Sequence, residues 1–261
     1  MVINVKYLMS INWKKTILVV CDIAIAAYLL LAVTAFNKPD VKAMQCSEVK
    51  IDIKENLVNG FLTTSEIKNI LSCDKIYPLS HPMESISPRQ IEETLQKSPF
   101  IEKAECYKTQ GGHVCIDVRQ RIPVVRVMAN NGESYYVDIN GNMMPETRYV
   151  TDLVIATGAI SHKYAQGTLT RVANHILQNQ FWKNQIVQIN ILPDGSMEMV
   201  PRIGDHIVYL GAPNHIDKKL ERLRKFYLYV LNKAGWNKYH YISVEFDNQI
   251  ICKKNSRKNK S

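Results

Sequence analysis

The sequence predicts an α+β protein with one N-terminal membrane helix and two folded domains behind it. Three observations lead to this prediction. One long apolar run lies near the N-terminus, a β-α-α-β-β pattern follows it, and the rest is mostly short strands with one long and one short helix. About 220 residues follow the run, more than one small core needs, so we expect two domains, over 48–127 and 128–252.

The apolar run covers residues 17–36, ILVVCDIAIAAYLLLAVTAF, and is interrupted only by Asp22. A helix of this length crosses the ~30 Å hydrocarbon core of a bilayer. A cleaved signal peptide is the alternative, but the run is longer than its usual apolar segment of ~7–15 residues. We therefore expect a retained transmembrane helix, joined to the first domain by a linker over 37–47.

Charge indicates the orientation of this helix. Lys6, Lys14 and Lys15 precede the run and no acidic residue accompanies them, which favours a cytoplasmic head over 1–16 and a body outside the membrane. The net charge of +9 is spread along the chain, except that the tail 253–261 has five basic and no apolar residues. We expect that tail to be disordered, and we do not expect nucleic-acid binding because no recognition motif accompanies the charge.

The first domain begins with an alternating apolar and charged segment that is typical of a half-buried strand. Thr63 with Glu66, and Ser87 with Gln90, are spaced as capping boxes at the starts of two helices. In order, we expect a strand over 49–54, a turn at Asn59-Gly60, helices after Thr63 and Ser87, and strands over 101–109 and 113–127. Two helices can cover one face of such a three-stranded sheet.

The second domain is predicted to be rich in strands. Its long helix should be capped by Asn214 and ended by Gly235, because an apolar stripe at helical spacing lies between them. We expect strands over 134–139, 186–192, 196–200, 206–210, 241–246 and 249–253, and a shorter helix over 170–180.

Six cysteines show no metal-binding spacing. Cys106 and Cys115 flank a predicted hairpin turn at Gly111-Gly112, and a loop over 109–112 would place them opposite each other on adjacent strands. An oxidising compartment would then permit a disulfide. Two free thiols that pack as small apolar groups are the alternative.

Catalytic motifs are weak throughout the chain. Ser65 to Lys68 and Ser47 to Lys50 both read Ser-x-x-Lys, but the Ser-x-Asn and Lys-Thr-Gly companions of penicillin-binding enzymes do not accompany them. The seven histidines are scattered, and no Gly-rich phosphate loop occurs. We expect no enzyme activity, no cofactor, no metal and no small-molecule substrate.

Several stretches in this order resemble the bacterial cell-division family FtsQ/DivIB. SPFIEKAECYK and HVCIDVRQRIPVVRV resemble the end of its POTRA domain, the polypeptide-transport-associated module, and ESYYVDINGNMMP resembles the hairpin that opens its second domain. YISVEFDNQIICKK resembles its last strand pair, and these strands are similar to those of family members from Bacteroidetes-like bacteria. Gln120 replaces the usual Glu of an acidic-Arg-x-Pro motif, and Ser243, Glu245 and Phe246 depart from the terminal pattern.

The resemblance implies a non-enzymatic scaffold at the division septum, not a catalyst. It implies that small bitopic partners similar to FtsB/DivIC and FtsL bind the second domain, partly by adding a strand to its terminal sheet edge. It also implies that other division proteins contact the POTRA domain. The expected partner-binding residues are Tyr239, Tyr241, Ser243, Glu245, Phe246, Gln249 and Ile251.

Two other classes of protein remain open. A POTRA-bearing transport or chaperone component of the envelope would normally show repeated POTRA units or a C-terminal barrel. An anchored cell-wall enzyme would need a catalytic constellation. Neither feature is evident in the sequence.

Overall fold

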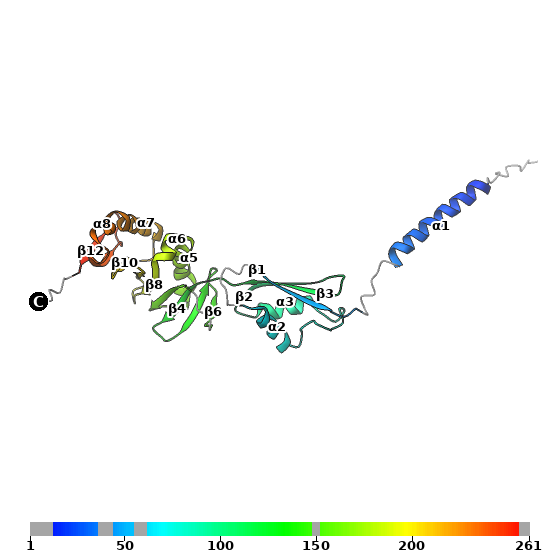
Figure 1. The fold of residues 1–261 in the computed structure, drawn as a ribbon, viewed down its shortest axis with the longest axis horizontal. Coiled ribbons are helices and arrows are strands. Elements are labelled where there is room, and N and C mark those ends of the chain that lie inside the picture. Colours follow the sequence, from blue (N-terminus) through cyan, green and yellow to red (C-terminus); the bar gives the residue numbers. More distant parts are fainter. Residues whose placement is uncertain (1–12, 36–43, 55–61, 148–151, 256–261) are drawn as a thin grey trace, which may run out of the picture. The chain divides into compact units, whose positions relative to one another are not determined.

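The structure is a computed structural model that describes residues 13–35, 44–54, 62–147 and 152–255 (Figure 1). The predicted turn at Asn59-Gly60, the first twelve residues and the last six lie outside these ranges. The described parts are one apolar helix, a three-stranded sheet with two helices, and a nine-stranded sheet with further helices. The predicted α+β fold is confirmed.

Helix α1 (Trp13–Ala35) contains most of the apolar run. At ~1.5 Å per residue its 23 residues extend about 35 Å, enough to cross a bilayer core. Within the described residues it is the one helix long and apolar enough to do so, and a signal sequence would pass the same test. The helix starts four residues before the predicted run, so that Lys14 and Lys15 form part of its first turn.

The first folded part after α1 contains β1 (Glu48–Lys54), α2 (Thr64–Cys73), α3 (Pro88–Gln96), β2 (Ile101–Lys108) and β3 (His113–Gln120). The strand order is β1-β3-β2, so β3 is the central strand. Val114, Ile116 and Val118 on β3 are fully buried while the residues between them are half-buried. This alternation is expected for a sheet that is covered by helices on one face (Figure 1).

The capping box predicted at the first helix is present. The backbone N–H of Glu66 donates to Thr63 Oγ1 at 3.3 Å, and the backbone N–H of Thr63 donates to Glu66 Oε2 at 2.7 Å. These bonds satisfy two donors that would otherwise lack a partner at the start of α2. Leu62, Ile67 and Leu71 are buried around this start.

The chain enters the first sheet through a segment that is bonded on both sides. Cys46 N–H donates to His81 O at 2.9 Å, and Ser47 N–H donates to Gly112 O at 3.0 Å. Gly112 has a φ of 76°, and a Cβ there would meet Met44 Sδ at 3.0 Å, so glycine is required at this close approach. The turn of the β2–β3 hairpin therefore holds the beginning of β1.

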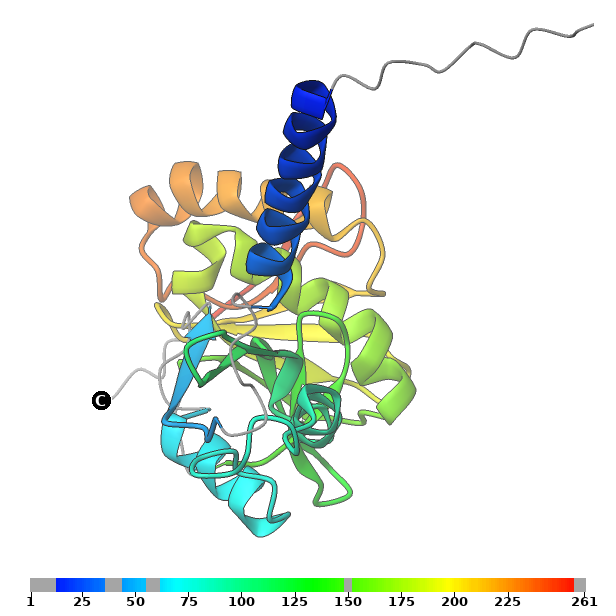
Figure 2. The same cartoon turned by 90° about the vertical axis from the view of Figure 1, so that its right-hand side faces the viewer.

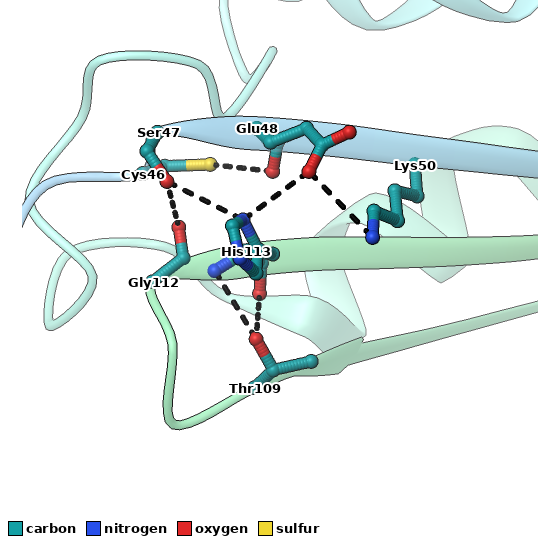
Figure 3. A network of polar contacts seen from close by, with 7 residues as sticks. All are labelled: Cys46, Ser47, Glu48, Lys50, Thr109, Gly112 and His113. Atoms are coloured by element: carbon teal, nitrogen blue, oxygen red, sulfur yellow. Dashed lines mark hydrogen bonds and ion pairs between the residues drawn. The ribbon is translucent and has the colours of Figure 1, made fainter.

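A small polar network surrounds this contact (Figure 3). His113 Nδ1 lies 3.3 Å from Ser47 Oγ and 3.5 Å from Glu48 Oε2, and Lys50 Nζ lies 3.6 Å from the same carboxylate oxygen. These side chains are largely exposed, so the network contributes little to stability and mainly fixes the local geometry.

The second domain is built on a nine-stranded mixed sheet with the order β12-β11-β10-β9-β8-β7-β4-β5-β6. Its strands are β4 (Pro123–Ala129), β5 (Ser134–Asp138), β6 (Met143–Pro145), β7 (Val154–Gly158), β8 (Ile186–Ile191), β9 (Met197–Pro201), β10 (Ile207–Gly211), β11 (Tyr239–Ser243) and β12 (Ile251–Lys254). The pairs β4–β7, β7–β8 and β10–β11 are parallel, and the other pairs are antiparallel.

Helices pack on one side of this sheet (Figure 2). One helical run combines α4 (His162–Tyr164), the π-helical turn η1 (Ala165–Leu169) and α5 (Thr170–Gln178), and α6 (Gln180–Gln185) follows it. A second run combines α7 (Ile216–Phe226), η2 (Tyr227–Leu231) and α8 (Asn232–Ala234). Their buried side chains form one core with alternate strand residues such as Ile189, Met199, Val208, Leu210 and Ile242.

One predicted strand needs correction. The strand predicted over 113–127 is two strands, because β3 ends at Gln120 and β4 belongs to the nine-stranded sheet. The short helix predicted over 170–180 is α5, which begins at Thr170 and continues a helical run that α4 and the π-helical turn η1 start at His162. Strand β7 and helix α6 were not predicted from the sequence.

The predicted cap of the long helix is also wrong. His215, in the left-handed conformation at φ 49°, is the N-cap residue of α7, and no side chain caps this helix. Asn214 instead accepts a hydrogen bond from Lys219 Nζ. Gly235 ends the helical run with a φ of 94°, as predicted.

Candidate partner-binding surface

Strand β12 forms one end of the nine-stranded sheet. It pairs antiparallel with β11, with Ser243 opposite Ile251, Ile242 opposite Cys252 and Tyr241 opposite Lys253. Among the described strands it has no neighbour on its other side. An antiparallel edge strand points half of its backbone donors and acceptors away from its neighbour, so this edge can accept a further strand.

The predicted partner-binding residues lie on the last two strands and in the connection between them. Tyr239, Tyr241 and Ser243 lie on β11, Ile251 begins β12, and Glu245, Phe246 and Gln249 lie in the connection between the two strands. Phe246 is 50% exposed and Ile251 is 45% exposed, so both are available for contact. Ser243 is 6% exposed, and its hydroxyl accepts a hydrogen bond from the Glu245 N–H at 3.4 Å.

Aromatic rings lie on the sheet face that bears no helices. The side chain of Ile242 on β11 belongs to the helix-covered core. Tyr209 on β10 pairs with the next residue, Ser243, and side chains alternate along a strand, so Tyr209 lies on the opposite face of the sheet. Tyr241 stacks on Tyr209 with ring centroids 6.1 Å apart, and Lys253 Nζ lies 4.8 Å from the Tyr241 ring centroid. Partial burial raises the pKa of Tyr241, with smaller contributions from nearby Tyr209 and acidic residues. Tyr241 is therefore a neutral aromatic platform at neutral pH.

Arg222 on α7 holds the connection between the last two strands. Its guanidinium donates to Val244 O at 3.2 Å and to Asp247 Oδ1 at 3.5 Å. The side chain of Arg222 is only 17% exposed, whereas that of Asp247 is 75% exposed. One cation thus links the helix to the segment that presents Phe246.

Lys219 is the second cation on the core-facing side of α7. It is 4% exposed and donates to Leu210 O at 2.9 Å, Ala212 O at 2.7 Å and Asn214 Oδ1 at 2.9 Å. Burial lowers the pKa of this lysine, while nearby Glu245 opposes the shift. Three acceptors at one ammonium group satisfy all of its donors and fix the β10–α7 loop.

Close backbone approach also shapes this surface. Gly211 ends β10 with a φ of 67°, and a Cβ there would meet Glu245 Cγ at 2.8 Å. The Glu245 side chain therefore passes directly over the β10 backbone, which only glycine permits here.

Sequence reasoning did not identify Arg222, Lys219 or Tyr209 as parts of this surface. One signal for Lys219 was present, because it lies three residues after Ile216 and four before Leu223, within the apolar stripe of the helix. A lysine at such a position implies a buried partner for its charge. Tyr209 offered no comparable signal, since its position depends on the pairing of β10 with β11.

The two hairpin cysteines are not bonded to each other in the structure. The Thr109 N–H donates to His113 O at 2.9 Å, which makes these two residues cross-strand partners and places Ile116 opposite Cys106. Cys106 is buried on the face of the sheet that points into the core. Cys115 is half-buried and lies on the opposite face, with the residues that alternate with Val114 and Ile116. The hairpin differs by one residue from the loop expected over 109–112, and a one-residue shift reverses the face of every side chain.

Metal ligands do not gather in this region. Within the ranges that the structure describes, no group of three or more His, Cys, Asp or Glu residues is placed to hold a metal ion.

The fold and the exposed edge define a class of protein: an N-terminal apolar helix, a small sheet-and-helix domain, and a larger domain that ends in an open edge strand. A family model for a POTRA-like domain matches residues 44–119. A second family model, described as FtsQ/DivIB, C-terminal related, matches residues 122–253, about half of the chain. The chain belongs to this FtsQ/DivIB-related family. No curated protein matches it.

Proposed function

We propose that this protein is a non-enzymatic, membrane-anchored scaffold of the bacterial division machinery. The family to which it belongs is the first support, because its name ties the second domain to division proteins. The open edge of β12 is the structural observation that carries the proposal, since a scaffold needs a surface that another chain can complete.

The partners in this proposal are small bitopic division proteins similar to FtsB/DivIC and FtsL. One of them adds a strand to β12, and Phe246 and Ile251 supply apolar contacts beside the added strand. Main-chain pairing gives affinity in such a complex, and side chains at alternate positions select the partner. Other division components bind the POTRA-like domain.

The proposed location is the inner membrane at the septum, with the N-terminus in the cytoplasm and both domains outside. This orientation is supported by the apolar helix and by the basic residues at its start, Lys14 and Lys15.

Capture of division proteins from crosslinked cells tests this function. Cells that express the full chain should yield small bitopic partners, and Phe246→Ala should weaken capture by about 1–3 kcal/mol, the range of an interface anchor. The N–H of Ile251 faces Ser243, whereas that of Cys252 faces the open edge, so Cys252→Pro should weaken capture more, because proline removes a ladder donor. Tyr107→Ala is the matched control, because Tyr107 is 51% exposed, about as much as Phe246, and lies on β2 of the first domain.

Depletion separates this function from its alternatives. Filamentous cells that fail to divide support the scaffold. Outer-membrane assembly defects would instead favour a transport component, and altered wall chemistry with the pure protein would favour an enzyme.

A further inference from the structure

We propose that the open edge of β12 selects an acidic extended segment and rejects a second copy of this chain. This inference rests on the proposed function, because it names the chemistry of the partner strand at that surface.

The edge strand carries unbalanced positive charge. Its four residues are Ile251, Cys252, Lys253 and Lys254, and both lysines are exposed. In the described part of the chain neither lysine is within ion-pair distance of a carboxylate, and Lys253 instead lies over the Tyr241 ring. The sequence continues with Arg257, Lys258 and Lys260 and no acidic residue.

The acidic residues around the last strand pair interact with groups other than the two lysines. Asp247 lies beside Arg222, and Glu245 lies over Gly211, where its charge acts on Lys219. Glu198 accepts a hydrogen bond from Asn190 Nδ2 at 3.2 Å. The two lysines of β12 are therefore the charges that an incoming strand meets.

The same lysines oppose pairing between two copies of the chain. If two β12 strands paired antiparallel about a two-fold axis, four lysines would lie within two short adjacent strands. Like charges in cross-strand positions are destabilising, and charged edge residues are a common means of preventing edge-to-edge association. An acidic strand replaces this repulsion with attraction.

Successive side chains of a strand point to opposite faces of the sheet, and this alternation specifies where the partner's acidic residues should lie. Lys253 and Lys254 are consecutive and point to opposite faces of the sheet, whereas Ile251 shares the face of Lys253. A matching segment therefore has acidic residues at two adjacent positions and an apolar residue two positions from one of them. Such a segment contacts both lysines and Ile251 at once.

Two labelled peptides test the inference with the full chain in detergent. Both are extended, twelve residues long and rich in Val and Thr, and one carries Glu where the other carries Lys. Fluorescence anisotropy at about 50 mM salt should show the Glu peptide binding at least about tenfold more tightly. The double variant K253E/K254E should reverse that preference, and added salt should weaken the favoured pairing.

Matched variants separate edge recognition from general attraction. K68E/K97E changes the net charge by the same amount at two exposed lysines of the first domain, and it should leave the preference unchanged. The Val244 N–H donates to Tyr209 O, so by alternation the N–H groups of Ser243 and Ile251 face each other and that of Cys252 faces the open edge. Cys252→Pro should therefore abolish binding of the Glu peptide. Equal affinity for the two peptides, a preference that K253E/K254E does not alter, or Glu-peptide binding that survives Cys252→Pro would each overturn the inference.

Self-association gives an independent readout. Sedimentation of the wild-type chain should show no association that depends on β12, and a dimer that Cys252→Pro dissociates would overturn the inference. The proposed function and this inference can fail independently. If the peptides behave as expected but no division protein is captured from cells, the proposed function fails and the edge preference stands.

Discussion

At the scale of single residues, His206 is a buried titratable group at the centre of an aromatic cluster. It is 1% exposed, its Nε2 lies 2.8 Å from the Tyr227 hydroxyl, and its ring stacks on Trp236. Burial lowers the pKa of His206, while the Trp236 backbone and Asp205 oppose the shift. The folded protein thus favours the neutral ring more than the unfolded chain does.

This shift predicts a loss of stability in acid. The contribution of neutral His206 to the free energy of unfolding is fully present above its ordinary pKa of ~6.5. It is lost as pH falls through the lower folded pKa, at about 1.4 kcal/mol per pH unit between the two values. His206→Gln keeps a hydrogen-bonding group and should flatten the pH dependence of unfolding between about pH 7 and 5. Tryptophan fluorescence can follow this, because Trp182 and Trp236 both lie in the cluster.

The exposed His81 supplies the control for this measurement. His81→Gln should retain the wild-type pH dependence. A His206→Gln curve that parallels the wild type would show that this ring does not govern the acid sensitivity.

A second prediction at this scale concerns Cys106 and Cys115. Because Ile116 lies opposite Cys106 and the two cysteines belong to alternate sets of side chains, we expect both to remain thiols. Alkylation of denatured, unreduced protein followed by mass spectrometry should find both modified. A linked peptide pair that disappears on reduction would instead establish the disulfide.

At the scale of elements, the β11–β12 connection depends on α7 for its shape. Arg222→Leu removes the hydrogen bonds to Val244 O and Asp247, so the amides of residues 244–250 should exchange faster in hydrogen–deuterium exchange. Arg224→Leu, on the same helix, is the control because its guanidinium lies over Phe181 at 5.3 Å from the ring centroid. Unchanged exchange in the Arg222 variant would mean that strand pairing alone holds the connection.

At the scale of the whole molecule, the proposed location predicts a fixed topology. If α1 is a retained membrane span, a reporter fused after Ser261 should be active only outside the inner membrane, because the basic start of α1 favours the cytoplasm. Fractionation checks retention, since release of the body as a soluble species would identify α1 as a signal sequence. Reporter activity in the cytoplasm would contradict both the topology and the proposed function.

Local patterns were enough to predict several elements. The capping box at Thr63 and Glu66 and the half-buried strand β1 depend on neighbours within a few residues, and both are present. The long helix and its end at Gly235 follow from an apolar stripe and a residue that tolerates positive φ. The strands β5 and β8 were likewise placed within a residue of their observed ends.

Other features depend on contacts between segments far apart in the sequence. The apolar segment 113–127 reads as one strand, and only its partners show that β3 and β4 belong to different sheets. The positions of Cys106 and Cys115 depend on a hairpin register that one residue reverses. Gly167 lowers helix propensity, yet a π-helical turn packed on the core continues through it.

The sequence by itself determined the apolar helix, the order of most elements and the basic end of the chain, because these follow from hydropathy, local periodicity and charge. It also predicted the last strand pair, but as 241–246 and 249–253, whereas β11 ends at Ser243 and β12 begins at Ile251. Only the tertiary structure decided that β12 is an edge, that Tyr209 lies beside Tyr241, and that Arg222 and Lys219 support the connection. Strand order and the pairing of buried charges are properties of the assembled sheet, and no local pattern encodes them.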